Sequence, residues 1–162
     1  MLALRYVALL ALVVWIGGLI ALGAIAAPVS FDVTAARQLP EPRMLAGALF
    51  GEMLRRFTLV GYAAGAIMLL SLVARRILGP RPRHFGFRAG IVTLMLGASA
   101  YAGIVVASRI DALQHEIGVA PSSLPAGDPR RVEFGTLHGL STALQLVPLL
   151  GGLALLFWEI KE

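Results

Sequence analysis

Four apolar runs, each long enough to cross a membrane, restrict the folds open to this chain more than any other feature. We expect them to form spans at about 2–27, 57–76, 88–110 and 132–158. A transmembrane helix needs about 20 mostly apolar residues, and backbone groups in lipid must form their hydrogen bonds within the protein. The sequence therefore predicts an all-α integral membrane protein: a four-helix bundle in a single domain, residues 1–162.

The composition agrees with a membrane protein. Of the residues, 58% are hydrophobic and 14% are charged, whereas soluble domains are about 25% charged. The net charge of +5 does not indicate nucleic-acid binding, because Arg and Lys stand at the ends of apolar runs, as membrane topology requires. The absence of cysteine excludes disulfides and thiolate metal sites. We expect the lipid bilayer as a partner and no nucleic acid.

The first apolar run allows a second interpretation, that of a cleaved signal peptide. Arg5 gives it a thin basic start, and Ala24-Ile25-Ala26 resembles a cleavage site. The apolar part of a signal peptide is only about 7–15 residues long, so the longer run here favours a span. We expect Pro28 to end this helix and a polar, proline-containing loop to follow.

The ends of the other helices are also marked in the sequence. Residues 44–56 are amphipathic, and they form either an interfacial segment or an N-terminal extension of the second span. We expect the third helix to project beyond the bilayer until Gly118 and Pro121 stop it. Asp128 is the expected N-cap of the last helix, with Pro129 at its first position.

The connection at 75–88 carries the strongest orientation signal. It contains five arginines and no acidic residue, and short loops rich in Arg and Lys stay in the cytoplasm. With four spans, both termini are then cytoplasmic. We expect a membrane of the bacterial inner-membrane type.

The last span carries a stripe of polar side chains. At about 100° per residue, one side of the helix presents His138, Ser141, Thr142 and Gln145. The opposite, lipid-compatible side presents Leu140, Leu144, Val147 and Ala154. We expect His138 to face the bundle interior and to bond a group on the first or third helix, with Trp15 nearby.

His138 can serve as a structural hydrogen-bond donor, a proton relay, or a ligand for haem or a metal. Asp111, His115 and Glu133 could join it at the ends of helices three and four, but these residues follow no recognised metal-ligand spacing. We expect Arg109 to form a salt bridge, with Asp111 on the same helix or with Glu133 on the next. No catalytic residue, metal or other cofactor is expected.

Small residues at helical spacing predict close helix packing. The pairs are Gly61 with Gly65, Ser99 with Gly103, and Gly135 with Gly139. Trp15-Ile16-Gly17-Gly18 is explained equally well by packing and by a ligand pocket. Pro148 should kink the last helix near Gln145.

Several motifs resemble one known family. They are Trp15-Ile16-Gly17-Gly18, Ala27-Pro28-Val29-Ser30-Phe31, Ala46-Gly47 with Phe50 and Phe57, and the run from Arg131 to Ser141. Together they resemble the transmembrane protein 205-like family, also known as domain of unknown function 4149, and the Phe-Gly-x-Leu-His-Gly-x-Ser run is their most specific part. The resemblance covers nearly the whole chain and implies a small four-span helical membrane protein without an established activity. The long basic loop and the proline-rich first loop do not match the family pattern.

Two other kinds of small four-helix membrane protein carry histidines, the copper-resistance type and the haem-biosynthetic oxidase type. This chain has one membrane histidine and no Met or Cys cluster beside it, which argues against both. The function we expect is that of a non-enzymatic accessory or interaction subunit, which contacts a protein partner or a second copy through small-residue helix faces. The alternative is a binder of a small ligand, haem or a metal through His138.

Overall fold

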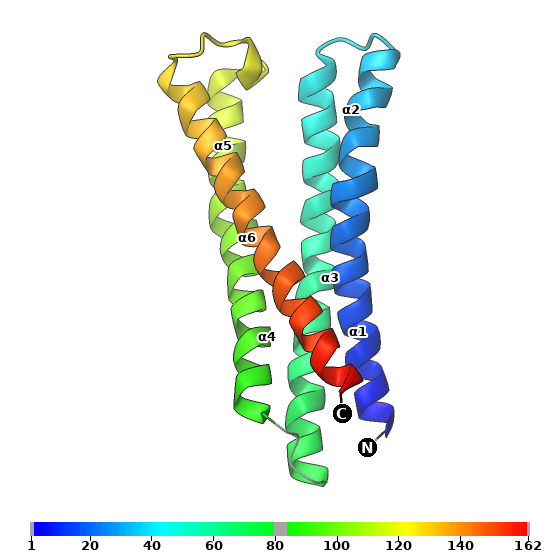
Figure 1. Cartoon of the computed structure of the whole chain (residues 1–162). Coiled ribbons are helices and arrows are strands. Elements are labelled where there is room, and N and C mark those ends of the chain that lie inside the picture. The colour runs from blue at the N-terminus through cyan, green and yellow to red at the C-terminus, as the bar shows by residue number, and fades with distance from the viewer. Residues whose placement is uncertain (1, 80–83, 162) are drawn as a thin grey trace.

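The computed structural model describes residues 2–79 and 84–161, and the long elements of this part of the chain are helices arranged as four rods (Figure 1). The rods are α1 (Leu2–Ala21), η1 (Leu22–Ala26) and α2 (Ala27–Ala36); α3 (Pro42–Leu78); α4 (Phe85–Ala100), η2 (Tyr101–Val106) and α5 (Ala107–Ile117); and α6 (Pro129–Ile160). A short 3-10 turn, η3 (Pro121–Ser123), precedes α6. Each rod is long and apolar enough to cross a membrane. The predicted four-helix membrane bundle is confirmed.

The first rod continues past Pro28, so the prediction that this proline ends the helix is wrong. Proline has no N–H, and its ring crowds the carbonyl four residues earlier. Here the preceding turn, η1, is π-helical, and the N–H of Ala27 bonds the carbonyl of Leu22, five residues back. Ser30 Oγ donates to the Ala26 carbonyl at 2.7 Å. The wider turn makes room for the proline, and the helix runs on to Ala36.

The segment 44–56 belongs to α3, which begins at Pro42 and runs without a break to Leu78. Of the two interpretations, the structure therefore contains the N-terminal extension. The third rod ends at Ile117, where Gly118 adopts a left-handed conformation with φ 69°, the usual glycine stop of a helix. Asp128 is the N-cap of α6 and accepts a hydrogen bond from the Arg130 N–H at 2.9 Å.

The four rods are packed together at one end and diverge at the other (Figure 1). The start of α1, the end of α3, the start of α4 and the end of α6 lie at the lower end, where α1 packs against α3 and α6, and α4 against α3 and α6. The core lies in this half and consists of Ala11, Leu12, Trp15, Ile16, Ala64, Met68, Leu72, Val92, Met95 and Leu155. In the upper half α2 packs on α3 and α5 packs on α6. These two pairs of helices diverge from each other towards the upper end (Figure 1).

Two glycines of α3 allow its close approach to neighbouring helices, as predicted. A Cβ on Gly61 would lie 2.8 Å from Trp15 Nε1, and a Cβ on Gly65 would lie 2.5 Å from Leu96 Cδ2. Both distances are shorter than real Cβ contacts, so a larger residue at either position would have to displace the Trp15 ring or the Leu96 side chain. Gly18 packs in the same way on the Phe57 ring. These contacts support the packing interpretation of the Trp15 to Gly18 motif.

The second predicted pair also packs, but the third does not. A Cβ on Gly103 would lie 3.1 Å from the Tyr62 hydroxyl, and that hydroxyl donates to the Ser99 carbonyl at 3.3 Å. In contrast, Gly135 and Gly139 have no other atom within 4 Å of their Cβ positions. This glycine pair on α6 faces away from the bundle.

Candidate functional site

One charged residue from each of the four rods meets the others at the packed end of the bundle. They are Arg5 of α1, Arg75 of α3, Arg88 of α4 and Glu159 of α6. Arg5 Nε lies 2.9 Å from Glu159 Oε2, and Arg75 Nη1 donates to Glu159 Oε1 at 3.1 Å. Arg88 donates to the same Oε1, and Arg5 also donates to the Glu159 carbonyl oxygen. We call these four residues the Arg–Glu cluster.

The Arg–Glu cluster is buried. The side chains of Arg88 and Glu159 are 4% and 8% exposed, and that of Arg5, the most accessible, is 30% exposed. Buried charges are stable only when paired, and removal of one partner from such a pair costs about 3–5 kcal/mol. The cluster can therefore hold four helix ends in fixed relative positions.

A small cavity lies next to the cluster. It has a volume of about 20 Å³ and is lined by Arg88 and Glu159 together with apolar side chains of all four rods. Glu159 Oε2 is close to Arg5, but no described residue forms a hydrogen bond of good geometry to this oxygen. The cavity is large enough to admit about one water molecule, which could donate to the oxygen.

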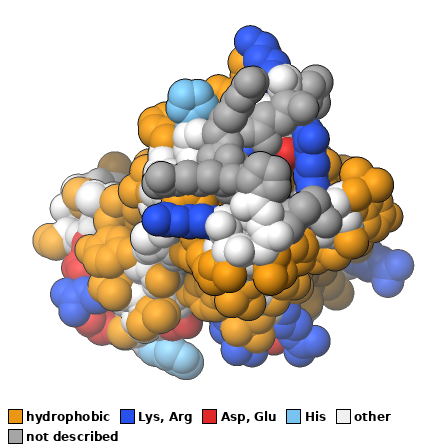
Figure 2. All heavy atoms as spheres, turned by 90° about the horizontal axis from the view of Figure 1, so that it is seen from below, with side chains coloured by type: hydrophobic (Ala, Val, Ile, Leu, Met, Phe, Trp, Pro, Cys, Tyr) orange, Lys and Arg blue, Asp and Glu red, His pale blue; other side chains and the backbone are white. Residues whose placement is uncertain are grey.

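Aromatic side chains close in sequence to the cluster residues lie at the same end of the bundle. The Arg76 guanidinium lies 4.8 Å above the Phe85 ring, and Lys161 Nζ lies 4.4 Å above the Phe157 ring. Phe87 and Trp158 meet edge to face with ring centroids 4.8 Å apart. Figure 2 views the molecule from this end, where hydrophobic side chains form most of the outline. Aromatic and basic residues of this kind mark the level of lipid headgroups.

The polar stripe of α6 is less covered than expected. His138 is exposed, and its ring stacks on Phe134 of the same helix with centroids 6.1 Å apart. The prediction that His138 faces the interior and bonds the first or third helix is therefore wrong. Ser141 and Gln145 are half-buried, with Gln145 Nε2 3.5 Å from Ser141 Oγ. Thr142 is exposed, and its hydroxyl donates to the His138 carbonyl.

The divergence of the rods explains this exposure. Ser141 and Glu159 are 18 residues apart, which is five turns of an α-helix, so they lie on the same face. The lower part of this face packs on α1: a Cβ on Gly152 would lie 2.7 Å from Ile16 Cγ1, and Glu159 contacts Arg5. The upper part of this face has no helix packed on it, because α6 diverges from the first rod towards its N-terminal end (Figure 1).

The apolar side expected to face lipid is also placed differently. Of Leu140, Leu144, Val147 and Ala154, only Leu140 is exposed. The reason is that this side faces α4, where a Cβ on Gly151 would lie 3.0 Å from Met95 Cγ. The large apolar side chains of α6 that are exposed in the membrane region are Leu140, Leu146, Leu150, Leu153 and Phe157.

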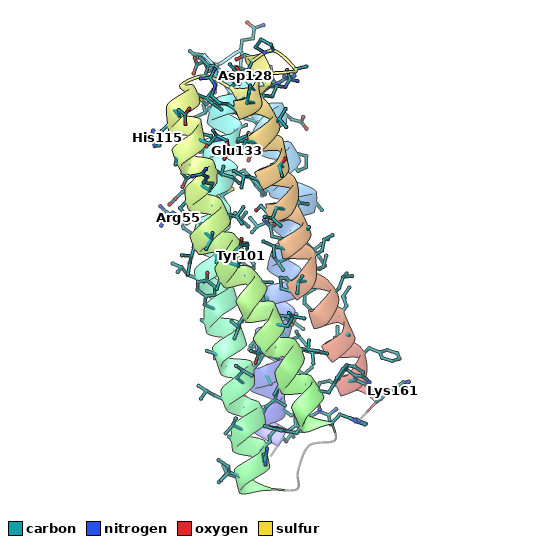
Figure 3. All side chains as sticks on the ribbon, turned by 90° about the vertical axis from the view of Figure 1, so that its left-hand side faces the viewer. Arg55, Tyr101, His115, Asp128, Glu133 and Lys161 are labelled. Atoms are coloured by element: carbon teal, nitrogen blue, oxygen red, sulfur yellow. The ribbon has the colours of Figure 1, made fainter. Side chains whose placement is uncertain are left out.

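The other predicted site residues are dispersed. Trp15 is 2% exposed within the core. Arg109 Nη2 lies 3.3 Å from Glu133 Oε1, which confirms the salt bridge between helices. Asp111 and His115 are exposed, and Figure 3 shows His115 pointing away from the bundle. Among the residues that the structure describes, no three His, Cys, Asp or Glu side chains come together as potential metal ligands.

The Arg–Glu cluster was not among the predicted sites, although the sequence held a signal for it. In a four-span chain, four helix ends lie on the same side of the membrane: the starts of the first and third runs and the ends of the second and fourth runs. Arg5, Arg88, Arg75 and Glu159 occupy those four positions. An acidic residue placed among arginines at one membrane boundary predicts ion pairing between helices.

Comparison with known proteins gives one match. The family model described as "Domain of unknown function (DUF4149)" matches residues 10–118, about two thirds of the chain. The matched part contains Arg75 and Arg88, whereas Arg5, Glu159 and all of α6 lie outside it. Comparisons with curated proteins and with solved structures gave no match.

Proposed function

Because the chain belongs to the DUF4149 family, to which no activity is attached, we propose a function from the molecule itself. The protein acts as a non-enzymatic accessory or interaction subunit that contacts a membrane partner through the polar stripe of α6. The observation that supports this proposal is the exposure of His138 and Thr142 beside the half-buried Gln145.

The depth of the stripe matters to this proposal. Glu159 lies at the lower membrane boundary, and α6 rises from it by about 21 Å to Gln145 and by about 32 Å to His138. The hydrocarbon core is about 30 Å thick, so Gln145 lies within it and His138 at its edge. Lipid tails offer no hydrogen-bond partner. A helix of another protein can supply one, at about 0.6 kcal/mol per bond and up to 1–2.

The neighbouring surface of α6 suits such a partner. Gly135 and Gly139 are exposed and unobstructed, and small residues four apart let two helices approach closely. They lie next to Thr142 around the helix at about 100° per residue. A partner helix could therefore pack closely against Gly135 and Gly139 and form hydrogen bonds with the adjoining polar stripe of α6.

Photo-crosslinking in native membranes tests the proposal. A photoreactive residue at Thr142 should give a discrete protein adduct, because it lies on the stripe. The same residue at Leu94, which is 63% exposed on α4, serves as the control and should give no discrete protein band. The proposal fails if Thr142 gives no protein adduct, or if both positions give the same adducts.

The alternative function is binding of a small ligand, haem or a metal through His138. It predicts a visible absorption band or a bound metal in the purified protein. It also predicts that His138→Ala removes that signal without lowering the melting temperature. That result would replace the interaction proposal.

We also propose that the chain is related to the transmembrane protein 205-like family, that it forms a single domain, and that it resides in a bacterial-type inner membrane. Kinship to the transmembrane protein 205-like family is supported by the run from Arg131 to Ser141, which lies outside the matched residues. The core that the four rods share supports a single domain over 1–162. The polar residues of α5 support the projection of this helix beyond the bilayer. A bacterial-type inner membrane with cytoplasmic termini is supported by the gathering of Arg5, Arg75 and Arg88 at one end of the bundle.

A further inference from the structure

A groove of about 510 Å³ runs between the third rod and α6 in the upper half of the bundle. Its walls include Ile104 and Val105 of η2 and Leu137 and Leu140 of α6, and Arg109 also lines it. We propose that this groove binds a phospholipid with an ethanolamine headgroup. An acyl chain occupies the apolar part, and Arg109 and Glu133 bind the headgroup. This inference does not depend on a protein partner.

The groove has the size and the lining of a lipid site. Its volume lies within the range of about 300–1,000 Å³ that is usual for small-molecule sites, which are mostly apolar with a few polar groups. Ile104, Val105 and Leu140 are exposed, so their side chains are available to an acyl chain. The third rod rises about 12 Å from Tyr101 to Arg109, and the groove therefore runs along the helix axis, the direction of lipid tails.

Arg109 lies at the level where a headgroup would be. The 21 residues from Arg88 to Arg109 rise about 32 Å along the rod, which matches the hydrocarbon thickness of about 30 Å. The Arg–Glu cluster then lies at one boundary and Arg109 at the other. In Figure 3 Tyr101 lies near the middle of the bundle and Glu133 nearer its upper end.

The charges at this end of the groove match a zwitterionic headgroup. Arg109 and Glu133 are 3.3 Å apart, and their side chains are 69% and 42% exposed. An exposed ion pair contributes little to stability, so each partner can exchange it for a ligand group. Guanidinium groups bind phosphate through two hydrogen bonds, and a carboxylate accepts hydrogen bonds from a primary ammonium. Phosphoethanolamine carries both groups.

The backbone of the third rod departs from regular α-helix where it lines the groove. The π-helical segment η2, Tyr101–Val106, supplies Tyr101, Ile104, Val105 and Val106 to the groove wall. Ser108 Oγ donates to the carbonyls of Ile104 and Val105, so these two backbone groups are satisfied beside an apolar surface. Single π turns inside α-helices are frequent at functional sites.

Native mass spectrometry of the purified full-length protein tests this proposal, with phosphatidylethanolamine, phosphatidylcholine and phosphatidylglycerol of matched chains added in equal amounts. We expect the wild type to retain phosphatidylethanolamine preferentially. Arg109→Gln should reduce retention of all three lipids about tenfold, as the loss of a charge-assisted contact implies. Glu133→Gln should abolish the preference for phosphatidylethanolamine while leaving phosphatidylglycerol bound.

Two further variants complete the test. Leu140→Trp fills the groove and should remove bound lipid while the helical circular dichroism and melting temperature stay those of the wild type. Arg55→Gln, which removes an exposed arginine that pairs with Glu52 and does not line the groove, should retain lipid as the wild type does. Equal retention of the three lipids by the wild type, or unchanged retention by Arg109→Gln or by folded Leu140→Trp, would overturn the proposal.

Discussion

Arg5 and Glu159 are 154 positions apart in the sequence and join the first helix to the last one. Arg5 Nε lies 2.9 Å from the Glu159 carboxylate, and the same guanidinium donates to the Glu159 carbonyl oxygen. Arg75 and Arg88 bring the two middle rods to the same carboxylate. One acidic side chain thus contacts every other rod of the bundle.

Glu159→Gln should destabilise the protein strongly. The amide keeps the shape of the side chain but leaves buried Arg75 and Arg88 without this carboxylate. Loss of one partner from a buried pair costs about 3–5 kcal/mol. Equilibrium unfolding in mixed detergent, followed by circular dichroism, measures the change.

Glu52→Gln is the matched control for this experiment. Glu52 also pairs with two arginines, Arg55 and Arg56, at 2.7 Å from each, but these side chains are exposed. Exposed pairs contribute little, and we expect a marginal change. If both glutamine variants unfold alike, the Arg–Glu cluster does not hold the bundle together.

Gly61→Ala should destabilise the contact between α1 and α3. The new Cβ would lie 2.8 Å from Trp15 Nε1, and Trp15 is 2% exposed within the core. Overpacking of this kind costs about 1–3 kcal/mol. Gly97→Ala, where no neighbouring atom lies within 4 Å, makes the same change without a clash and should be neutral or stabilising. The melting temperatures of the two variants, measured by thermal unfolding under the same conditions, test this prediction.

Asp128 should titrate below its ordinary range. Hydrogen bonds from the Arg130 side chain and backbone lower the pKa of this carboxyl. Its stabilising effect on the start of α6 is therefore fully present above the unfolded pKa of about 3.9 and is lost as the pH falls through the lower folded value. Arg130→Gln should raise this pKa. NMR titration of the Asp128 carboxyl carbon measures the pKa in the wild type and in the variant. A pKa unchanged by the substitution would contradict the role given to Arg130.

The orientation of the chain can be tested with single cysteines, since the protein has none of its own. His84, directly before α4, and Ser122, in η3 after α5, are both exposed, and the start of α4 and the end of α5 lie at opposite ends of the bundle. An impermeant thiol reagent should label Ser122→Cys in intact cells and His84→Cys only after permeabilisation, because the arginine-rich connection belongs in the cytoplasm. The reverse labelling pattern would place the termini outside.

The fold could be predicted from the sequence because the length of an apolar run is a direct measure of membrane crossing. Helix starts and stops were readable wherever a local rule decides them, as at Asp128 and Gly118. Pro28 was misleading because its effect depends on the turn before it. A π turn such as η1 carries no recognisable signature in Leu22 to Ala26, so the continuation to Ala36 could not be foreseen.

The site was harder to predict than the fold. Helical spacing correctly grouped Ser141 and Gln145 on one face, but whether a neighbouring helix covers that face depends on how far the rods diverge. His138 is exposed for that reason. Glu159 on its own does not indicate a site, because a charged residue after the last apolar run is typical of a tail. Its pairing can be predicted only from the ends of all four runs together.

The one-sided packing of the bundle has a mechanical consequence. With the rods joined at Glu159 and α5 packed on α6, the upper third rod and α6 can tilt together as one lever that pivots near the C-terminus of α6. About 30 residues of helix separate this pivot from Pro129, an arm of about 45 Å. A tilt of about 5° at the pivot would displace the far end of such an arm by roughly 4 Å. A change too small to disturb the buried ion pairs would thus alter the width between α6 and the first rod at the opposite membrane surface.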